Sequence, residues 1–115
     1  PLRLVGSEMC IRDSNEWSTL GVGMAIKELG LKDRVCAIGF DNNTECVGML
    51  ETGELDTLIV QNPFSMGYLA VMNAANILSG KKTESVIKTD VYVVDRSNMF
   101  SADVQKILFG FDKYD

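Results

Sequence analysis

Histidine is absent from the 115-residue sequence, and basic residues are few, with 11 Lys and Arg against 16 Asp and Glu. Without histidine the chain offers no Ser-His-Asp triad, no Cys-His pair and no imidazole metal ligand. The formal net charge of −5 and a single adjacent basic pair, Lys81-Lys82, give no basic surface for phosphate contacts. No apolar run approaches the ~20 residues that span a bilayer. The composition thus argues against an ordinary hydrolase, a nucleic-acid-binding segment and a membrane span.

The residues that are present describe a small globular domain, since 46% are hydrophobic and 23% are charged. Two of the three cysteines, Cys36 and Cys46, fall mid-strand and mid-helix in the expected pattern. A disulfide between them is not expected, because such positions rarely meet disulfide geometry. Nor do we expect a metal ion, a cofactor or catalytic residues.

From residue 15 onward, helical and strand patterns alternate. Helices end at Gly30, Gly53 and Gly80, because glycine readily adopts the left-handed conformation that follows a helix. The expected helices are 16–29, 43–51, 63–80 and 101–109, and the expected strands are 34–40, 57–61 and one or two within 86–95. Strands separated by helices predict an α/β fold with a parallel sheet, and the apolar run 34–40 is typical of a strand buried on both faces.

Residues 1–14 do not fit this pattern. Back-translated, Val5 to Asp13 reads like the transposon-end adapter of sequencing libraries, so we expect a non-native, adapter-derived leader and a natural sequence from Asn15. The alternative is a first β-strand, since Leu2 and Leu4 alternate. If the leader is an artefact, the absence of a signal peptide says nothing about the compartment.

Polar residues occur where the expected strands end. Asp41 directly follows the strand 34–40, Gln61 ends the strand 57–61, and Asn15 precedes the first helix. Ligands of open parallel sheets bind at the carboxyl ends of the strands, and these side chains suit neutral hydroxyl groups. The alternative is that Asp41 and Asn42 are turn residues that cap the next helix.

Aromatic and methionine side chains are expected to pack rather than to bind ligand. Trp17 could stack on a sugar ring, but packing is favoured. The positions Phe64, Met66, Tyr68 and Met72 are expected to lie mostly in the core, on one face of their helix.

Several motifs together resemble a known family. They are NEWSTLGVGMA from Asn15, GFD at Gly39–Asp41, Gln61 before a helix that carries Met66-Gly67, and the closing KTDVYVVDRSNM and SADVQKILF. The combination resembles the C-terminal part of the type 1 periplasmic binding proteins of the ribose-binding branch. These share their fold with the effector domains of LacI-type repressors.

The resemblance implies a truncated three-layer α/β/α fold of two lobes. Residues 15–61 would lie mostly in the second lobe, 62–89 in the first, and 90–115 would return to the second. It also implies that Asn15, Asp41 and Gln61 hydrogen-bond sugar hydroxyls.

The function implied is that of a non-enzymatic binding protein, a monomer when intact, that captures a small sugar and delivers it to an ABC transporter permease. Such a protein would be periplasmic, or extracellular and membrane-anchored. The alternative is a cytoplasmic sugar-sensing repressor domain, because DRSN from Asp95 resembles the ending of those repressors.

Overall fold

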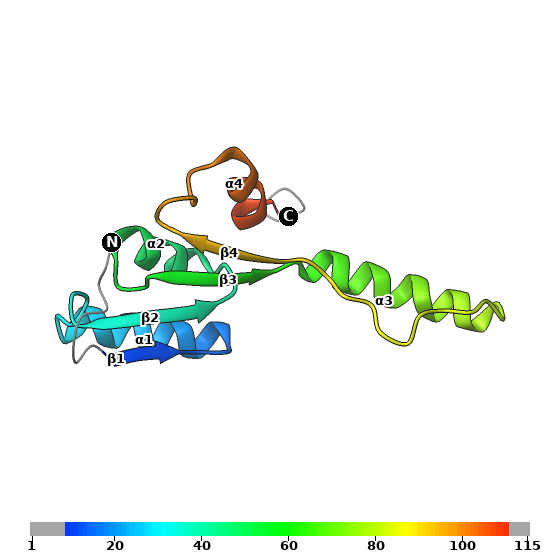
Figure 1. Ribbon diagram of the computed structural model, residues 1–115, viewed down its shortest axis with the longest axis horizontal. Helices are drawn as coiled ribbons and strands as arrows, with labels where there is room; N and C mark the ends of the chain where they lie inside the picture. The colour runs from blue at the N-terminus through cyan, green and yellow to red at the C-terminus, as the bar shows by residue number, and fades with distance from the viewer. Residues whose placement is uncertain (1–8, 111–115) are drawn as a thin grey trace. The chain divides into compact units, whose positions relative to one another are not determined.

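The computed structural model of the chain describes residues 9–110, which divide into two compact units (Figure 1). The first unit contains the described residues up to Val60 and from Val93, and the second runs from Gln61 to Tyr92. The elements in chain order are β1 (Met9–Arg12), α1 (Glu16–Glu28), β2 (Val35–Phe40), α2 (Thr44–Thr52), β3 (Thr57–Gln61), α3 (Pro63–Leu78), β4 (Val91–Asp95) and α4 (Ala102–Phe109).

The four strands form one sheet in the order β1-β2-β3-β4. β1 pairs in parallel with β2, with Arg12 opposite Ile38, and β2 pairs in parallel with β3, with Phe40 opposite Ile59. Figure 1 shows β4 running opposite to β3 at the edge of the sheet. The predicted α/β class is confirmed, with three parallel strands and one reversed edge strand.

β1 was not predicted, and it lies within the segment expected to derive from an adapter. Its pairing with β2 fills the place of the strand that should precede the first helix. The non-native origin of residues 1–14 stays a prediction, as does the alternative strand at Leu2 and Leu4, which lies outside the described residues.

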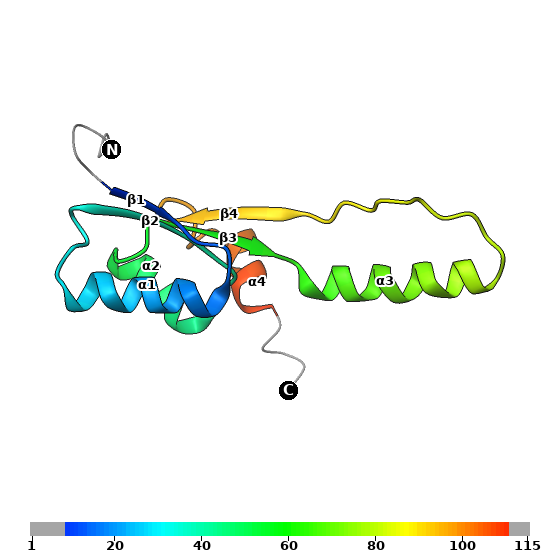
Figure 2. The ribbon, with the colours of Figure 1, turned by 90° about the horizontal axis from the view of Figure 1, so that it is seen from below.

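Helices α1, α2 and α4 lie on the same side of the sheet (Figure 2). The buried core lies between these helices and the strands, and its members include Ile26, Ala37, Leu50, Leu58, Val60, Val94 and Leu108. The expectation that 34–40 is buried on both faces is wrong for the described chain. Ala37 and Gly39 are buried, whereas the alternating residues Ile38 and Phe40 are only half-buried, because no described helix of the first unit covers the second face.

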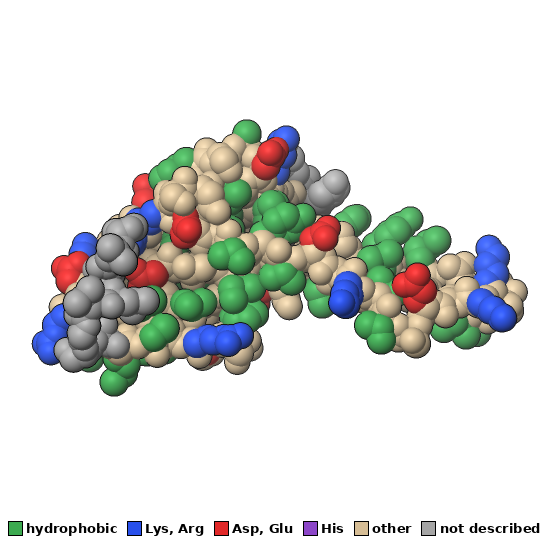
Figure 3. All heavy atoms as spheres, viewed as in Figure 1, with side chains coloured by type: hydrophobic (Ala, Val, Ile, Leu, Met, Phe, Trp, Pro, Cys, Tyr) green, Lys and Arg blue, Asp and Glu red, His purple; other side chains and the backbone are tan. Residues whose placement is uncertain are grey.

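The uncovered face is apolar. Strand alternation places Ile38, Phe40, Ile59 and Val93 on it, and Val93 is 62% exposed. Figure 3, viewed as Figure 1, shows hydrophobic side chains gathered over the strands.

Helix α1 packs closely on β2. A side chain at Gly39 would collide with Thr19, which is fully buried, and one at Gly23 would collide with the sulfur of Met49 on α2. These two glycines therefore set how near α1 lies to the sheet and to α2.

The second unit consists of α3 and the segment that follows it. The side chain of Asn62 caps α3 by accepting a hydrogen bond from the Ser65 amide, and Pro63 occupies the first turn, as expected. No residue of α3 is buried in the described structure: Phe64, Met66, Tyr68 and Met72 are 61%, 42%, 58% and 43% exposed. Their expected core position is thus wrong here.

Only 91–95 of the expected strand region 86–95 forms a strand, because 86–90 meets no other described strand in its unit and a strand needs a hydrogen-bonding neighbour. Among the described residues, Cys36 and Cys46 are not joined by a disulfide bond. Within residues 9–110, no helix is long and apolar enough to cross a membrane.

Candidate functional site

Asp41 stands directly beyond the carboxyl end of β2, in an unusual backbone conformation. Its φ is 66°, the left-handed region, and it is the one non-glycine residue in the described range 9–110 with a positive φ. Its amide donates a hydrogen bond to the Ile59 carbonyl of β3 at 2.9 Å. Aspartate tolerates this conformation better than most residues, yet such positions concentrate at binding sites, where the surrounding structure imposes them.

The alternative that Asp41 or Asn42 caps the second helix is wrong. The cap of α2 is Asn43, whose Oδ1 accepts a hydrogen bond from the Glu45 amide at 2.9 Å. Asn42 instead points to the far end of the chain, where its Nδ2 donates to the Leu108 carbonyl of α4 at 2.7 Å. The Asp41 carboxylate is therefore not used as a helix cap.

Asn15 lies before α1 and caps that helix. Its Oδ1 accepts a hydrogen bond from the Trp17 amide at 3.0 Å, which leaves its NH₂ group as the donor that a ligand could use. Trp17 is 71% exposed, so the favoured packing role is wrong within the described structure.

Gln61 is the last residue of β3 and is half-buried. It is also the first residue of the second unit and is followed directly by the α3 cap Asn62. Like Asp41, it stands at the carboxyl end of a central strand, because β2 and β3 run parallel.

The surroundings of Asp41 and Asn15 are acidic. Burial, with a contribution from the nearby Glu16 charge, raises the pKa of Asp41 above its usual value. Burial also acts to raise the pKa of Asp13, but hydrogen bonds from Ser18, Ser14 and Thr19 outweigh it and lower that pKa. An edge with carboxylate acceptors suits ligands that carry hydroxyl donors and disfavours anions. Residues 9–110 contain no group of three residues placed to hold a metal ion.

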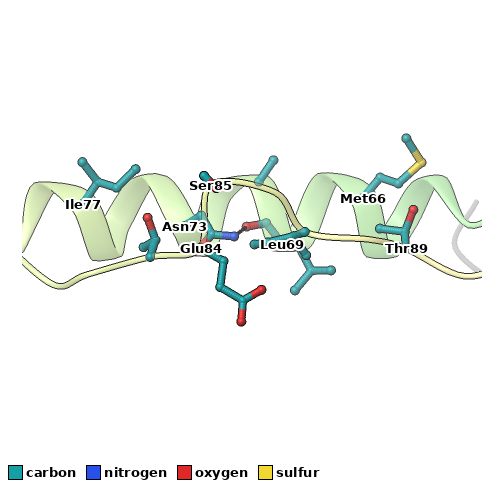
Figure 4. Close-up of a pocket in the computed structure, with 10 residues that line it drawn as sticks. Met66, Leu69, Asn73, Ile77, Glu84, Ser85 and Thr89 are labelled. Atoms are coloured by element: carbon teal, nitrogen blue, oxygen red, sulfur yellow. Dashed lines mark hydrogen bonds between the residues drawn. The ribbon is translucent and has the colours of Figure 1, made fainter.

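Two hollows are lined by other residues. One, of about 350 Å³, lies in the second unit between α3 and residues 83–89 (Figure 4). Met66, Leu69 and Ile77 line it from the helix, and Asn73 Nδ2 donates to the Leu69 carbonyl at 2.9 Å. The other, of about 630 Å³, lies between α1 and α2, lined by Met24 and Met49 among others.

The sequence analysis did not predict the hydrogen bonds that anchor the two residues beside Asp41. Phe40 donates its amide hydrogen to Thr19 Oγ1 at 3.0 Å, and Asn42 is bound to α4. The glycine of GFD was a usable signal, because a glycine inside a buried strand marks a close approach of another element. The partner of Asn42, 66 residues further along the chain, has no local signal.

A sheet with parallel central strands and helices between them defines an open-sheet α/β fold, a class in which ligands bind at the carboxyl ends of the strands. Comparison with known proteins specifies the family: the model of the periplasmic binding protein domain matches residues 9–82. The chain belongs to the periplasmic binding protein domain family.

The relatives are sugar-binding proteins by name. The chain is 33% identical over 89 residues to the ribose import binding protein RbsB of Haemophilus influenzae, covering 77% of this chain and 30% of that protein. It is 36% identical over 73 residues to the Bacillus subtilis protein of the same name, covering 64% of this chain and 23% of that one.

The solved structures that this chain resembles are also sugar-binding proteins by their names. A carbohydrate transporter solute-binding protein from Agrobacterium radiobacter, in complex with D-arabinose, has a TM-score of 0.80 at 33% identity, covering 87% of this chain and 34% of that one. A solute-binding protein from Agrobacterium vitis with bound D-fucose has a TM-score of 0.78 at 33% identity over the same shares. The chain therefore spans about a third or less of the relatives that it matches.

Proposed function

We propose that this chain is the C-terminal third of a sugar-binding protein that delivers its ligand to an ABC transporter. The observation that carries the proposal is the Asp41 carboxylate. It stands at the carboxyl end of β2, is not engaged as a helix cap, and is held in a left-handed backbone conformation. The names of the relatives, which bind ribose, arabinose and fucose, support the same ligand class.

In this proposal Asp41 accepts hydrogen bonds from two neighbouring sugar hydroxyls. Such bonds are stronger than those to neutral acceptors, because the carboxylate is charged. Asn15 donates through its NH₂ group while its Oδ1 caps α1, and Gln61 donates and accepts from the end of β3. The three residues contribute to a cleft that the remaining two thirds of the protein complete.

In this proposal the chain passes from the second lobe to the first directly after β3 and returns to the second lobe just before β4. Residues 15–61 would lie mostly in the second lobe, 62–89 in the first, and 90–115 in the second again. The division into units at Gln61 and Tyr92 supports this assignment. The apolar sheet face and the exposed α3 are consistent with further elements of the same fold.

The implied partners are a small sugar and a transporter permease, with the binding protein a monomer located in the periplasm or at the outer cell surface. The rival function is a repressor's sugar-sensing domain. Upstream sequence separates the two: a signal peptide or lipoprotein cysteine supports transport, and a helix-turn-helix contradicts it.

The binding claim is tested on the full-length protein, by which we mean the product of the complete source gene. Isothermal titration calorimetry against a panel of pentoses and hexoses, with an amino acid and a phosphorylated sugar as controls, is the direct assay. We expect saturable binding of at least one neutral monosaccharide. A protein that binds none of the neutral sugars contradicts the proposed ligand class.

A further inference from the structure

The conformation of Asp41 needs support from its neighbours. A non-glycine residue with φ of 66° is strained, and the strain persists only when the surrounding structure holds it. The Asp41 amide is held by the Ile59 carbonyl at 2.9 Å, which fixes the backbone on the sheet side. Both neighbouring residues are anchored as well, each to a different helix.

The residue before Asp41 is anchored to α1. The Phe40 amide donates to Thr19 Oγ1 at 3.0 Å, and Thr19 is fully buried against Gly39. The close approach that glycine permits thus places an acceptor from α1 within reach of the last residue of β2.

The residue after Asp41 is anchored to α4. Asn42 Nδ2 donates to the Leu108 carbonyl at 2.7 Å and lies 3.5 Å from the Ile107 carbonyl. These carbonyls belong to the last turn of α4, where the helix itself offers no amide partner. Leu108 is buried, so the helix end that receives Asn42 is itself fixed in the core.

We propose that Asn42 is a positioning residue for the sugar-binding carboxylate, and that α4 is thereby a structural part of the binding site. Asn42 does not touch the sugar. It holds the chain directly after Asp41. The Asp41 backbone thereby keeps its left-handed conformation, and the carboxylate keeps its direction, before the sugar binds. This inference depends on the proposed function and adds to it a role for the C-terminal helix.

The test uses the full-length protein and four variants: Asn42→Ala, Asp41→Ala, the double variant and Gln105→Ala. Gln105 is the matched control, because its Nε2 also donates from a side-chain amide to a backbone carbonyl, that of Met99 at 2.6 Å, and this bond involves none of residues 40–42. Calorimetry gives the sugar affinity, and thermal unfolding gives the stability of each variant.

We expect Asn42→Ala to weaken sugar affinity about threefold to tenfold, the loss that one hydrogen bond's net contribution would give. Gln105→Ala should lower the unfolding temperature similarly and leave affinity within about twofold. In the Asp41→Ala background, Asn42→Ala should cause no further loss of affinity, because the group that it positions is gone.

Equal effects of Asn42→Ala and Gln105→Ala on affinity, or additive losses in the double variant, would mean that Asn42 only anchors α4 and would overturn the inference. If Asn42→Ala does not fold, Asn42→Leu, which keeps a side chain of similar size but has no donor, takes its place; unchanged affinity in that variant also overturns the inference. Should Asp41→Ala bind sugar as the unmodified protein does, the proposed site itself fails. If Asp41→Ala weakens sugar binding while Asn42→Ala leaves the affinity unchanged, only the positioning role of Asn42 fails.

Discussion

Replacing Gly39 by alanine tests whether α1 positions the end of β2. A methyl group there would collide with the side chain of Thr19, whose Oγ1 and Cβ would lie 2.9 and 3.1 Å from the added carbon. Thr19 is fully buried, so it has no free space into which to move. Overpacking of this kind costs about 1–3 kcal/mol.

The collision has a second effect, because Thr19 also accepts the hydrogen bond of the Phe40 amide. Leaving that half-buried amide unpaired costs about a further 1 kcal/mol or more. Against this, Gly→Ala reduces the freedom of the unfolded chain, which is worth about 0.4–1 kcal/mol. The expected net loss of stability for Gly39→Ala is therefore about 2–3 kcal/mol.

Chemical denaturation of the full-length protein measures this loss, with Gly21→Ala as the matched control. Gly21 is also a glycine of the first unit, but a methyl group there meets no atom within 4 Å, so this variant should be more stable by about 0.5–1 kcal/mol. Thr19→Ser removes the Cγ2 that the new methyl group would strike while keeping the hydroxyl. The Gly39→Ala, Thr19→Ser double variant should therefore recover part of the loss relative to Gly39→Ala. A Gly39→Ala protein as stable as the unmodified one would refute the reasoning.

Two further predictions concern single titrating groups. Burial, with Glu16, Glu45 and Asp13 adding to it, raises the pKa of the Cys46 thiol to about 11, so Cys46 should resist alkylation at pH 8 until the protein is denatured. Peptide mass spectrometry after iodoacetamide treatment checks this, and full alkylation of the native protein would contradict it. Hydrogen bonds from the Ser97 hydroxyl and amide hold the pKa of Asp95 below its usual value. The ionised Asp95 carboxylate therefore stabilises the fold at neutral pH, and this stabilisation is lost as the pH falls through the lowered pKa. Asp95→Asn should thus unfold at a lower temperature than the unmodified protein at pH 7, with the difference closing on acidification; a difference that does not change with pH would be inconsistent with this assignment.

Local signals in the sequence predicted most of the elements. Gly30 and Gly53 follow α1 and α2 with positive φ, Pro63 begins α3, and helix and strand bounds agree within a few residues. Each of these features depends on neighbours in the chain, so local chemistry decides it.

Burial was predicted less well, because burial depends on which elements pack together in three dimensions, and the local sequence pattern does not show that. Phe64 and Trp17 have the residue type and spacing of packed side chains, yet both are exposed here, since no described element covers them. Similarly, the 86–90 segment has the composition of a strand but pairs with no strand among residues 9–110.

The candidate site was predicted from strand ends, which requires only the order of elements. The sequence did not predict which residue binds ligand and which caps the helix, because Asp41, Asn42 and Asn43 are all chemically able to cap α2. Only three-dimensional structure assigns the cap to Asn43 and directs Asn42 to α4.

The most direct test of the account is the sugar affinity of the full-length protein with Asp41→Ala, measured by calorimetry beside Asn43→Ala. Asn43 serves as the control because it caps α2 two residues away and has no proposed contact with the sugar. Losing hydrogen bonds to a charged acceptor costs about 1.5–3 kcal/mol, so Asp41→Ala should weaken binding at least about tenfold, while Asn43→Ala should lower stability and leave affinity nearly unchanged. An Asp41→Ala protein that binds sugar as tightly as the unmodified one would contradict the assignment of this strand end as the sugar site.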